Sequence, residues 1–256
     1  MDWKSKTVFL TGASSGIGEG LALAMAAKGA TVGLLARREE LLQDLAARCE
    51  AAGGKARYFA CDVVDADAVH QAAAKFRDEF GRIDIMIANA GISGKSRETR
   101  DFVPSAVKEV VDTNLMGAVN VIHAVLPQML ERGSGQLVAI SSLAGFRGLP
   151  KSAAYSASKA AMTAFFESVR LDVAHQGVDV TIIQPGFIRT PLTAGRESKM
   201  PFLMNLDDAI PHFMRAIEHK KKFAAFPWQL ATIVRLGKIM PACLYDRVAG
   251  RAKYRE

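Results

Sequence analysis

Short apolar runs alternate with longer amphipathic segments along this chain of 256 residues, and this alternation restricts its fold more than any other feature. Several of the runs are apolar at consecutive positions, as expected for strands of a parallel sheet that helices cover on both faces. The sequence therefore predicts a doubly wound α/β fold. The expected strands cover residues 7–10, 31–36, 56–61, 83–88, 136–141 and 179–183, and the expected helices about 16–28, 39–52, 65–80, 104–132 and 152–176.

Composition predicts one folded domain over residues 1–256, because no break in composition occurs before about residue 190. We expect no signal or transit sequence ahead of the first strand. No uncharged apolar stretch reaches the length of ~18–20 residues that a membrane span needs. The three cysteines have no metal-ligand spacing, so we expect no metal site and free thiols in a reducing cytoplasm.

A glycine-rich turn joins the first strand to the first helix, in the order Thr11-Gly12-Ala13-Ser14-Ser15-Gly16-Ile17-Gly18. Glycines in such a turn let the backbone approach a diphosphate closely, and the following helix N-terminus offers free N–H groups. The spacing is GxxxGxG rather than GxGxxG. A simple turn is the alternative, but the strand–turn–helix context favours a dinucleotide site.

The end of the second strand carries Ala36, Arg37 and Arg38. An acidic residue at this place would bind the ribose hydroxyls of NAD. Two guanidinium groups suit a 2′-phosphate instead. The alternative is that both arginines are solvated, but the missing acid together with the paired bases favours NADP(H).

Tyr155 and Lys159 are one helical turn apart, and Ser142 precedes the tyrosine by thirteen residues. An ammonium near a phenol favours the phenolate and so lowers the pKa of the phenol. A serine hydroxyl could bind the oxygen of a substrate at the same place. The three residue types together indicate proton transfer to or from a carbonyl or an alcohol.

Seven motifs, read in order, resemble those of the short-chain dehydrogenase/reductase family over about residues 5–192. They are TGASSGIG (11–18), Asp62 in CDV, NAG (89–91), Asn114 in TNLMG, Ser142 in ISSLAG, YSASK (155–159) and PGFIRT (185–190). The resemblance implies a Rossmann-type fold and reversible hydride transfer between NADP(H) and a ketone or aldehyde and its alcohol. It also implies a homo-oligomer, a dimer or a tetramer, that pairs through the helices at 104–132 and 152–176.

The same resemblance implies roles for single residues. The implied catalytic residues are Asn114, Ser142, Tyr155 and Lys159, with Ser142 preferred to Ser141 for its spacing to the tyrosine. The implied cofactor-binding residues are Gly12, Ser14, Ser15, Gly16, Ile17, Gly18, Arg37, Arg38, Asp62, Val63, Asn89, Ala90, Gly91, Tyr155, Lys159, Pro185, Gly186, Ile188 and Thr190. Simpler alternatives stay open: Asp62 as a helix cap, Asn114 as a locally satisfied residue, Ser142 as an ordinary strand end and Pro185-Gly186 as a turn.

Two functions compete with a reductase of hydrophobic carbonyls. One is an NADP-binding scaffold or redox sensor without turnover, which the presence of Tyr155 and Lys159 disfavours. The other is reduction of a ketoacyl group on an acidic carrier protein, which the basic C-terminus could attract. Nucleic acid is not an expected partner, because the basic residues lie among apolar ones and no nucleic-acid motif occurs.

The C-terminal quarter holds most of the net charge of +7. Residues 196–256 contain 12 Lys and Arg against 6 Asp and Glu. We expect residues 192–226 to form a substrate lid with an apolar pocket, or else to pack their apolar side chains in the core. Residues 220–256 depart from the compact ending of the family, which commonly closes with a last strand, and residues 227–256 predict an apolar, basic helical extension. Its broad apolar face must be buried on the enzyme or a partner subunit, rest on a membrane surface, or remain exposed and prone to aggregation.

Overall fold

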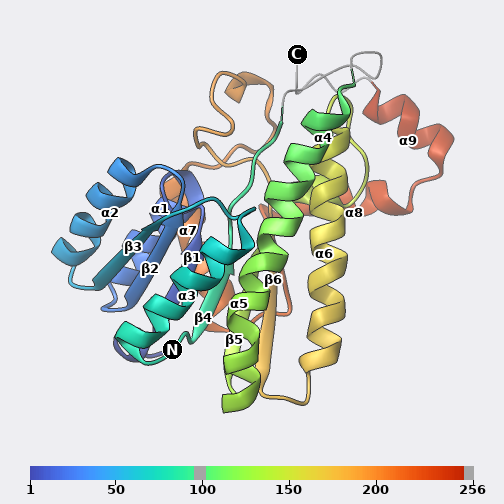
Figure 1. The fold of residues 1–256 in the computed structure, drawn as a ribbon. Helices are drawn as coiled ribbons and strands as arrows, with labels where there is room; N and C mark the ends of the chain where they lie inside the picture. Colours follow the sequence, from blue (N-terminus) through green and yellow to red (C-terminus); the bar gives the residue numbers. More distant parts are fainter. Residues whose placement is uncertain (95–101, 251–256) are drawn as a thin grey trace.

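The computed structural model describes residues 1–94 and 102–250 and shows a seven-stranded parallel sheet in the order β3-β2-β1-β4-β5-β6-β7 (Figure 1). The predicted fold class is confirmed. The strands are β1 (Thr7–Thr11), β2 (Thr31–Ala36), β3 (Lys55–Ala60), β4 (Ile85–Ala88), β5 (Gly135–Ile140), β6 (Val178–Pro185) and β7 (Phe223–Phe226).

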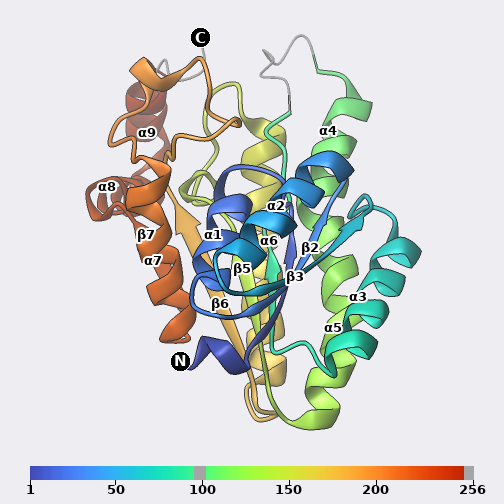
Figure 2. The same ribbon diagram turned by 90° about the vertical axis from the view of Figure 1, so that its left-hand side faces the viewer.

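Helices cover both faces of this sheet, as Figures 1 and 2 show. One layer contains α1 (Gly16–Ala26), α2 (Glu39–Ala51) and α7 (Leu206–Glu218), and the other contains α3 (Ala66–Phe80), α5 (Gly117–Arg132) and α6 (Ala153–Val173). Two core clusters fill the space between the sheet and the layers. Successive residues of a strand contribute side chains to opposite clusters. Val8 and Leu10 belong to the first cluster, beneath α1, α2 and α7, and Phe9 belongs to the second, beneath α3, α5 and α6.

Strand β7 is the main element that the sequence patterns did not predict. It pairs with β6 at the edge of the sheet and follows three lysines. Its four residues are too few to show a period of their own, so they carried no strand signal. The chain therefore does close with a final strand, and the expected departure from a compact ending begins only after Phe226.

The segment predicted as one helix over 104–132 changes geometry in its middle. Helix α4 (Pro104–Val111) leads into a π-helical turn, Asp112–Met116, and then into α5. Asn114 lies in that turn, and its side chain is completely buried. A π-turn inserts an extra residue into the helical register, which re-aims the side chains around it.

The same stretch, Pro104–Arg132, is long and apolar enough by composition to cross a membrane, which differs from the expectation that no segment would be. Among the described residues it is the one stretch of this kind. Val121, Val125 and Met129 of α5 are buried in the second core cluster. The apolar side chains thus pack against the sheet, and their composition reflects this core position.

Short helices complete the described fold. They are the 3₁₀ turns Trp3–Ser5, Leu143–Gly145 and Glu197–Lys199, followed at the C-terminus by α8 (Trp228–Ile239) and α9 (Ala242–Ala249). Leu230 and Ala231 of α8 are buried against Leu143 in a small separate cluster. One face of the extension therefore packs on the enzyme itself, while residues 251–256 lie outside the described residues.

Part of the expected lid belongs to the body of the domain. Phe213 and Met214 of α7 are buried in the first core cluster, where Phe213 meets the ring of Phe226 edge-on. Met200, by contrast, lines the large cavity described below. For α7 the alternative of core packing therefore holds, and a lid role remains a prediction for residues near Met200.

Candidate active site

A cavity of about 610 Å³ lies at the carboxyl ends of the strands. The chain winds outward in opposite directions from β1 and β4, so a crevice forms between the loops that follow these two strands. Ligand sites of doubly wound sheets form at such a crevice. The residues that follow β1, β2, β4, β5 and β6 all contribute to the walls.

The glycine-rich turn brings three backbone segments into close contact. Gly12 and Gly16 have φ angles of +65° and +58°, which favour glycine. A Cβ atom on Gly12 would lie 2.7 Å from the Cα of Ala90, and one on Gly18 would lie 2.2 Å from the carbonyl oxygen of Gly12. Side chains are therefore excluded here, and the first N–H groups of α1, which have no partners within the helix, are left at the cavity wall.

Two arginines stand over the rim of this turn. The Nη2 atom of Arg38 donates to the hydroxyls of Ser14 (2.9 Å) and Ser15 (2.8 Å). Arg37 Nη1 lies 3.6 Å from the carboxylate of Asp62. Both arginines line the cavity and are largely exposed, so two positive charges are available beside the end of β2.

Thr11 joins the turn to the end of β4, a role that no sequence motif assigned. Its Oγ1 accepts from the N–H groups of Asn89 (3.1 Å) and Ala90 (3.2 Å). The Asn89 amide in turn donates to the carbonyls of Thr11 (3.0 Å) and Gly12 (3.1 Å). These bonds hold the two loops together, and a threonine at a strand end carries no separate signal in the sequence.

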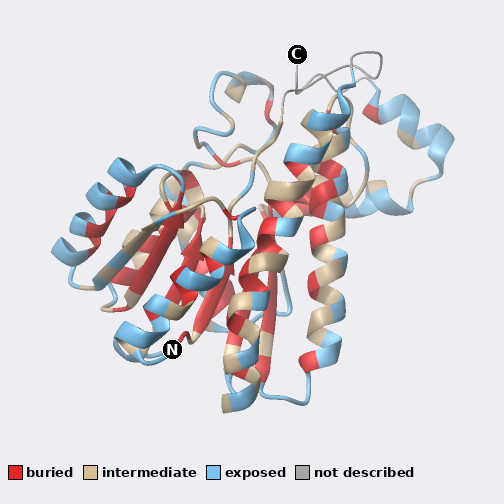
Figure 3. Ribbon diagram, viewed as in Figure 1, coloured by how far each residue is buried: buried red, intermediate tan, exposed pale blue. Residues whose placement is uncertain are grey.

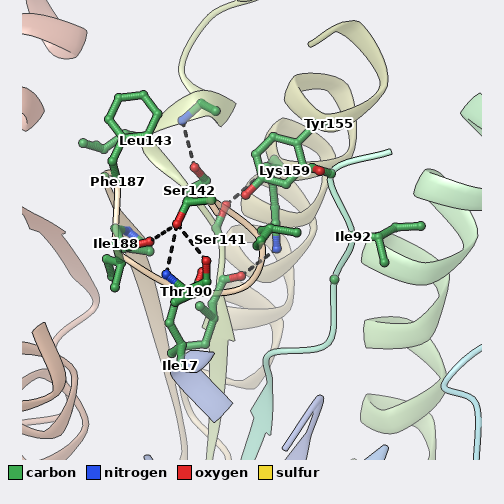
Figure 4. A pocket seen from close by; sticks show the side chains of 18 of the residues that line it. Ile17, Ile92, Ser141, Ser142, Leu143, Tyr155, Lys159, Phe187, Ile188 and Thr190 are labelled. Atoms are coloured by element: carbon green, nitrogen blue, oxygen red, sulfur yellow. Dashed lines mark hydrogen bonds between the residues drawn. The ribbon is translucent and has the colours of Figure 1, made fainter. Parts of the chain in front are cut away.

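The adjacent serines after β5 have different surroundings. Ser141 Oγ lies 3.0 Å from the carbonyl oxygen of Lys159 and 2.8 Å from Thr163 Oγ1, so it is engaged with α6. Ser142 Oγ accepts from the N–H of Ala144 at 3.1 Å. A hydroxyl that accepts this bond keeps its own hydrogen available for a ligand. Figure 4 shows Ser142 with Tyr155 and Lys159 around one cavity.

Lys159 is buried beneath the cavity, with its Nζ donating to the carbonyl oxygen of Ile140 at 2.8 Å. Burial penalises the charged form and lowers the pKa of Lys159 to about 8. No carboxylate among the described residues pairs with this ammonium. A buried cation at this place raises the electrostatic potential that acts on groups above it.

Asn114 and Gly18 lie behind the wall rather than on it. Asn114 Oδ1 accepts from the N–H of Ile92 (2.7 Å), while its Nδ2 donates to the Ile92 carbonyl (3.0 Å) and to Ser158 Oγ (2.9 Å). Ser158 Oγ donates to the Tyr155 carbonyl at 2.9 Å. The alternative of local satisfaction thus describes Asn114 well, and its bonds tie the loop after β4 to the helix of the tyrosine.

The other predicted site residues line the cavity together. They are Gly12, Ser14, Ser15, Gly16, Ile17, Arg37, Arg38, Asp62, Val63, Asn89, Ala90, Gly91, Ser142, Tyr155, Lys159, Pro185, Gly186, Ile188 and Thr190. Asp62 also accepts from the N–H of Val64, while Asp65 caps α3. The alternative that Asp62 caps that helix is therefore not what the structure shows.

Gly145 ends the ISSLAG motif, but the sequence assigned it no role of its own. A Cβ atom there would lie 2.8 Å from the carbonyl carbon of Lys159 and 2.9 Å from the backbone nitrogen of Ala160. The 3₁₀ turn after Ser142 therefore rests directly on the backbone of α6. This close approach sets the distance between the strand that carries Ser142 and the helix that carries Tyr155 and Lys159.

A further part of the cavity wall that the sequence did not predict comes from the C-terminal extension. Residues of α8, α9 and the link between them line the cavity: Leu230, Ile233, Val234, Gly237, Met240, Tyr245 and Val248. Arg147, from the loop between Ser142 and Tyr155, donates through Nη1 to the carbonyls of Gly237 (2.6 Å) and Met240 (2.7 Å). A cation bound to the last carbonyls of a helix also complements the helix dipole.

A family model described as short chain dehydrogenase matches residues 6–201. The chain belongs to this family. It is 44% identical over 249 residues to an uncharacterized oxidoreductase of Myxococcus xanthus, covering 97% of this chain and 98% of the relative. The chain is thus an oxidoreductase of the short-chain family.

Two further relatives carry more specific names. A 3beta-hydroxysteroid dehydrogenase of Mediterraneibacter gnavus is 36% identical over 188 residues, covering 73% of this chain and 68% of that protein. The crystal structure of a 3-ketoacyl-ACP reductase from Sinorhizobium meliloti superposes with a TM-score of 0.80 at 26% identity, covering 89% of this chain and 99% of that one.

Family membership implies a nicotinamide dinucleotide, NAD or NADP, and the cavity fits such a group. The cradle formed by Gly12 and Gly16 has no room for side chains, and it stands before the N-terminus of α1, where backbone N–H groups suit a diphosphate. Thr190 approaches this cradle from the opposite side, with its Cβ 3.1 Å from where a Cβ of Gly16 would be. The dinucleotide supplies or accepts a hydride when bound.

Proposed function

We propose that this protein is an NADP(H)-dependent oxidoreductase that interconverts a bulky hydrophobic ketone or aldehyde and the corresponding alcohol. The observation that carries the proposal is that Ser142, Tyr155 and Lys159 line the same cavity as the glycine-rich turn. Proton-transfer groups and a dinucleotide cradle are thereby placed within reach of one ligand.

In the direction of reduction, the Ser142 hydroxyl donates a hydrogen bond to the substrate oxygen and orients the carbonyl. The Tyr155 hydroxyl then gives its proton to that oxygen as the carbonyl carbon is reduced. In the reverse direction the Tyr155 oxygen takes the proton from the alcohol. General acid–base steps of this kind contribute about 10²–10⁴ in rate.

Lys159 supports Tyr155 through its charge. Its pKa of about 8 leaves most of the side chain cationic at neutral pH. A cation beneath the phenol stabilises the phenolate that forms when Tyr155 gives up its proton. Asn114 acts as a positioning residue, because its hydrogen bonds connect the loop of Ile92 to the backbone of Tyr155 through Ser158.

NADP is the proposed cofactor because the end of β2 carries Ala36, Arg37 and Arg38 rather than an acid. The Arg38 guanidinium donates to the serine hydroxyls of the glycine-rich turn, and Arg37 and Arg38 would hold the 2′-phosphate. A phosphate is a stronger acceptor for a guanidinium than a neutral hydroxyl is.

The proposed substrate class rests on the wall that α8 and α9 provide. Leu230, Val234 and Met240 present apolar side chains to the cavity, and Leu149 and Phe187 add to them. Such a wall favours a ligand with a large hydrocarbon surface. The name of the M. gnavus relative, a hydroxysteroid dehydrogenase, agrees with this class.

The decisive experiment compares Tyr155→Phe with the unchanged enzyme on a panel of steroid-like and alkyl ketones, with NADPH oxidation as the readout. We expect the variant still to bind NADPH and to lose about 10²–10⁴ in kcat. Near-normal turnover by the variant would refute the proposed role of Tyr155. Ser141→Ala is the matched control, because its hydroxyl is engaged with α6.

Two outcomes of the panel would favour the competing functions. NADPH binding without turnover of any carbonyl would indicate a scaffold or sensor. Turnover confined to a ketoacyl group on a carrier protein, the substrate class named for the S. meliloti structure, would indicate a carrier-dependent reductase.

A further inference from the structure

The C-terminal extension leaves a large apolar surface uncovered. Trp228 and Ile239 of α8 are 71% and 80% exposed, and Leu236 is 57% exposed. On α9, Leu244 and Val248 are also exposed and stand one helical turn apart. Figure 3 shows α8 and α9 largely in the colour of exposed residues, outside the two helix layers. We call these five residues the outer apolar face.

This face has the form of an interfacial helix surface. At 100° per residue, Trp228, Ile239 and Leu236 fall within an arc of about 80° on α8, opposite the buried Leu230. Arg235 stands at the Trp228 edge of this arc. Apolar side chains with basic residues alongside are the pattern of helices that lie at the surface of a membrane.

The charges around the face are basic and unpaired. Within the part of the chain that the structure describes, none of Arg235, Lys238 and Arg247 forms an ion pair. Lys238 lies 5.6 Å from the Phe146 ring, at the inner edge of α8. Asp246 is the one acidic residue between Trp228 and Gly250. Anionic lipid headgroups complement this charge, and each basic residue near such a surface adds to the attraction.

A second copy of the chain fits the same face less well. In a two-fold dimer each patch meets the identical patch of the partner. Arg235, Lys238 and Arg247 of both copies would then gather at one interface without matching acids. Like charges brought together in this way disfavour the contact.

The face is also continuous with the mouth of the active-site cavity. Ile233 and Val248 line the cavity and are nevertheless 55% and 56% exposed. These two side chains therefore form part of both the cavity rim and the outer surface. A ligand that moves between lipid and the cavity would pass along apolar side chains.

We propose that α8 and α9 dock on an anionic membrane surface through the outer apolar face, with the cavity mouth turned toward the lipid. Arg235, Lys238 and Arg247 contact the headgroups, and Trp228, Leu236 and Ile239 enter the apolar boundary. Membrane docking through this face does not depend on turnover. If the vesicle experiment contradicted the docking, the proposed oxidoreductase function would therefore be unaffected.

Sedimentation with vesicles tests the proposal, with the full-length protein and neither cofactor nor substrate. Vesicles of phosphatidylcholine with phosphatidylserine are compared with vesicles of phosphatidylcholine alone. We expect binding to the anionic vesicles, weakened by salt, and a loss of about tenfold or more for L236N/I239N. R235Q/K238Q should lose about tenfold on the anionic vesicles only.

Leu171→Asn is the matched control, because Leu171 on α6 is 71% exposed and lies outside the face. The control should bind vesicles as the unchanged protein does. Equal sedimentation of L236N/I239N and the unchanged protein would overturn the proposal. So would a change from dimer to monomer in L236N/I239N by analytical ultracentrifugation, because a second copy would then cover the face.

Discussion

The guanidinium of Arg147 lies 3.8 Å from the centre of the Tyr245 ring, and this contact joins the active-site loop to the C-terminal extension. The Tyr245 hydroxyl donates back to the carbonyl of Gly148 at 2.6 Å. Together with the bonds from Arg147 to the end of α8, these contacts hold α8 and α9 against the loop between Ser142 and Tyr155. The extension is thus fastened as a wall of the cavity.

Arg147→Met should detach α8 and α9 from the loop between Ser142 and Tyr155. Hydrogen bonds from charged groups contribute about 1.5–3 kcal/mol each, so we expect KM for a hydrophobic ketone to rise about tenfold while kcat stays within about twofold. Tyr245→Phe keeps the ring and loses one hydrogen bond, and its effect should be smaller. Steady-state kinetics and limited proteolysis at residues 228–250 measure both effects.

The control for this pair is Arg57→Met, which removes an exposed ion pair between Arg57 of β3 and Glu79 of α3, at the edge of the sheet opposite β7. It should change neither KM nor proteolysis. A fall in kcat with an unchanged KM in Arg147→Met would contradict the role in holding the wall.

Gly145→Ala should move Ser142 away from Tyr155 and Lys159. Its Cβ would meet the backbone of Lys159 at 2.8 Å, which neither helix nor turn can avoid without moving. We expect a loss of about 1–3 kcal/mol in the free energy of unfolding, with kcat lowered at least tenfold. Gly148→Ala is the control, because nothing lies within 4 Å of its added Cβ. Equal effects of the two substitutions in chemical denaturation would contradict this explanation.

Arg38→Ala should weaken NADPH more than NADH. Loss of a guanidinium that binds the 2′-phosphate should raise KM for NADPH by about 10–100-fold, and KM for NADH should change little. Arg48→Ala serves as the control, because Arg48 pairs with Glu19 and Asp44 outside the cavity. An equal loss for both cofactors would argue against a phosphate contact of Arg38.

The buried Lys159 predicts a pH dependence of stability. Its pKa is about 8 in the folded protein, against 10.5 for a freely solvated lysine, so the unfolded chain binds more protons between these values. Burial of the charged ammonium reduces the free energy of unfolding by its full amount below pH 8. This reduction disappears as the pH rises toward 10.5, because the folded protein then holds a neutral amine. Compared with Lys159→Met, the free energy of unfolding of the unchanged protein should therefore rise by about 2–3 kcal/mol between pH 7.5 and 10.

Urea denaturation of both proteins at several pH values measures this difference. Other titrating groups are shared by the two proteins and cancel in the comparison. A parallel pH dependence for Lys159→Met and the unchanged protein would show that the ammonium is not desolvated.

Local sequence patterns were sufficient for most of the fold. Strands such as Thr31–Ala36 are apolar at consecutive positions, and the helices between them show their own period, so β1 to β6 and the helices α1, α2, α3, α5 and α6 were predictable. Strand β7 was not, because four residues at a sheet edge are defined by pairing with β6 rather than by a pattern of their own.

The candidate site also contains residues that the sequence predicted and residues that it did not. The glycine-rich turn, Tyr155, Lys159 and Ser142 were recognisable because their chemistry requires particular residue types at short spacing. The roles of Gly145 and Thr11 were not, although both residues lie within the quoted motifs, because these roles arise from close approaches and hydrogen bonds between segments far apart in the chain.

The doubly wound fold, the family and the group of residues around Tyr155 all follow from the order of amino acids alone. The place of α8 and α9 as a wall of the cavity, and the role of Arg147 in fastening them there, emerge only when the chain is folded. The physical reason is that periodicity shows that a helix is amphipathic, whereas the surface it meets depends on packing between distant segments. One side of α8 meets Leu143 beside the active site, and the other side, with Trp228 and Ile239, remains open.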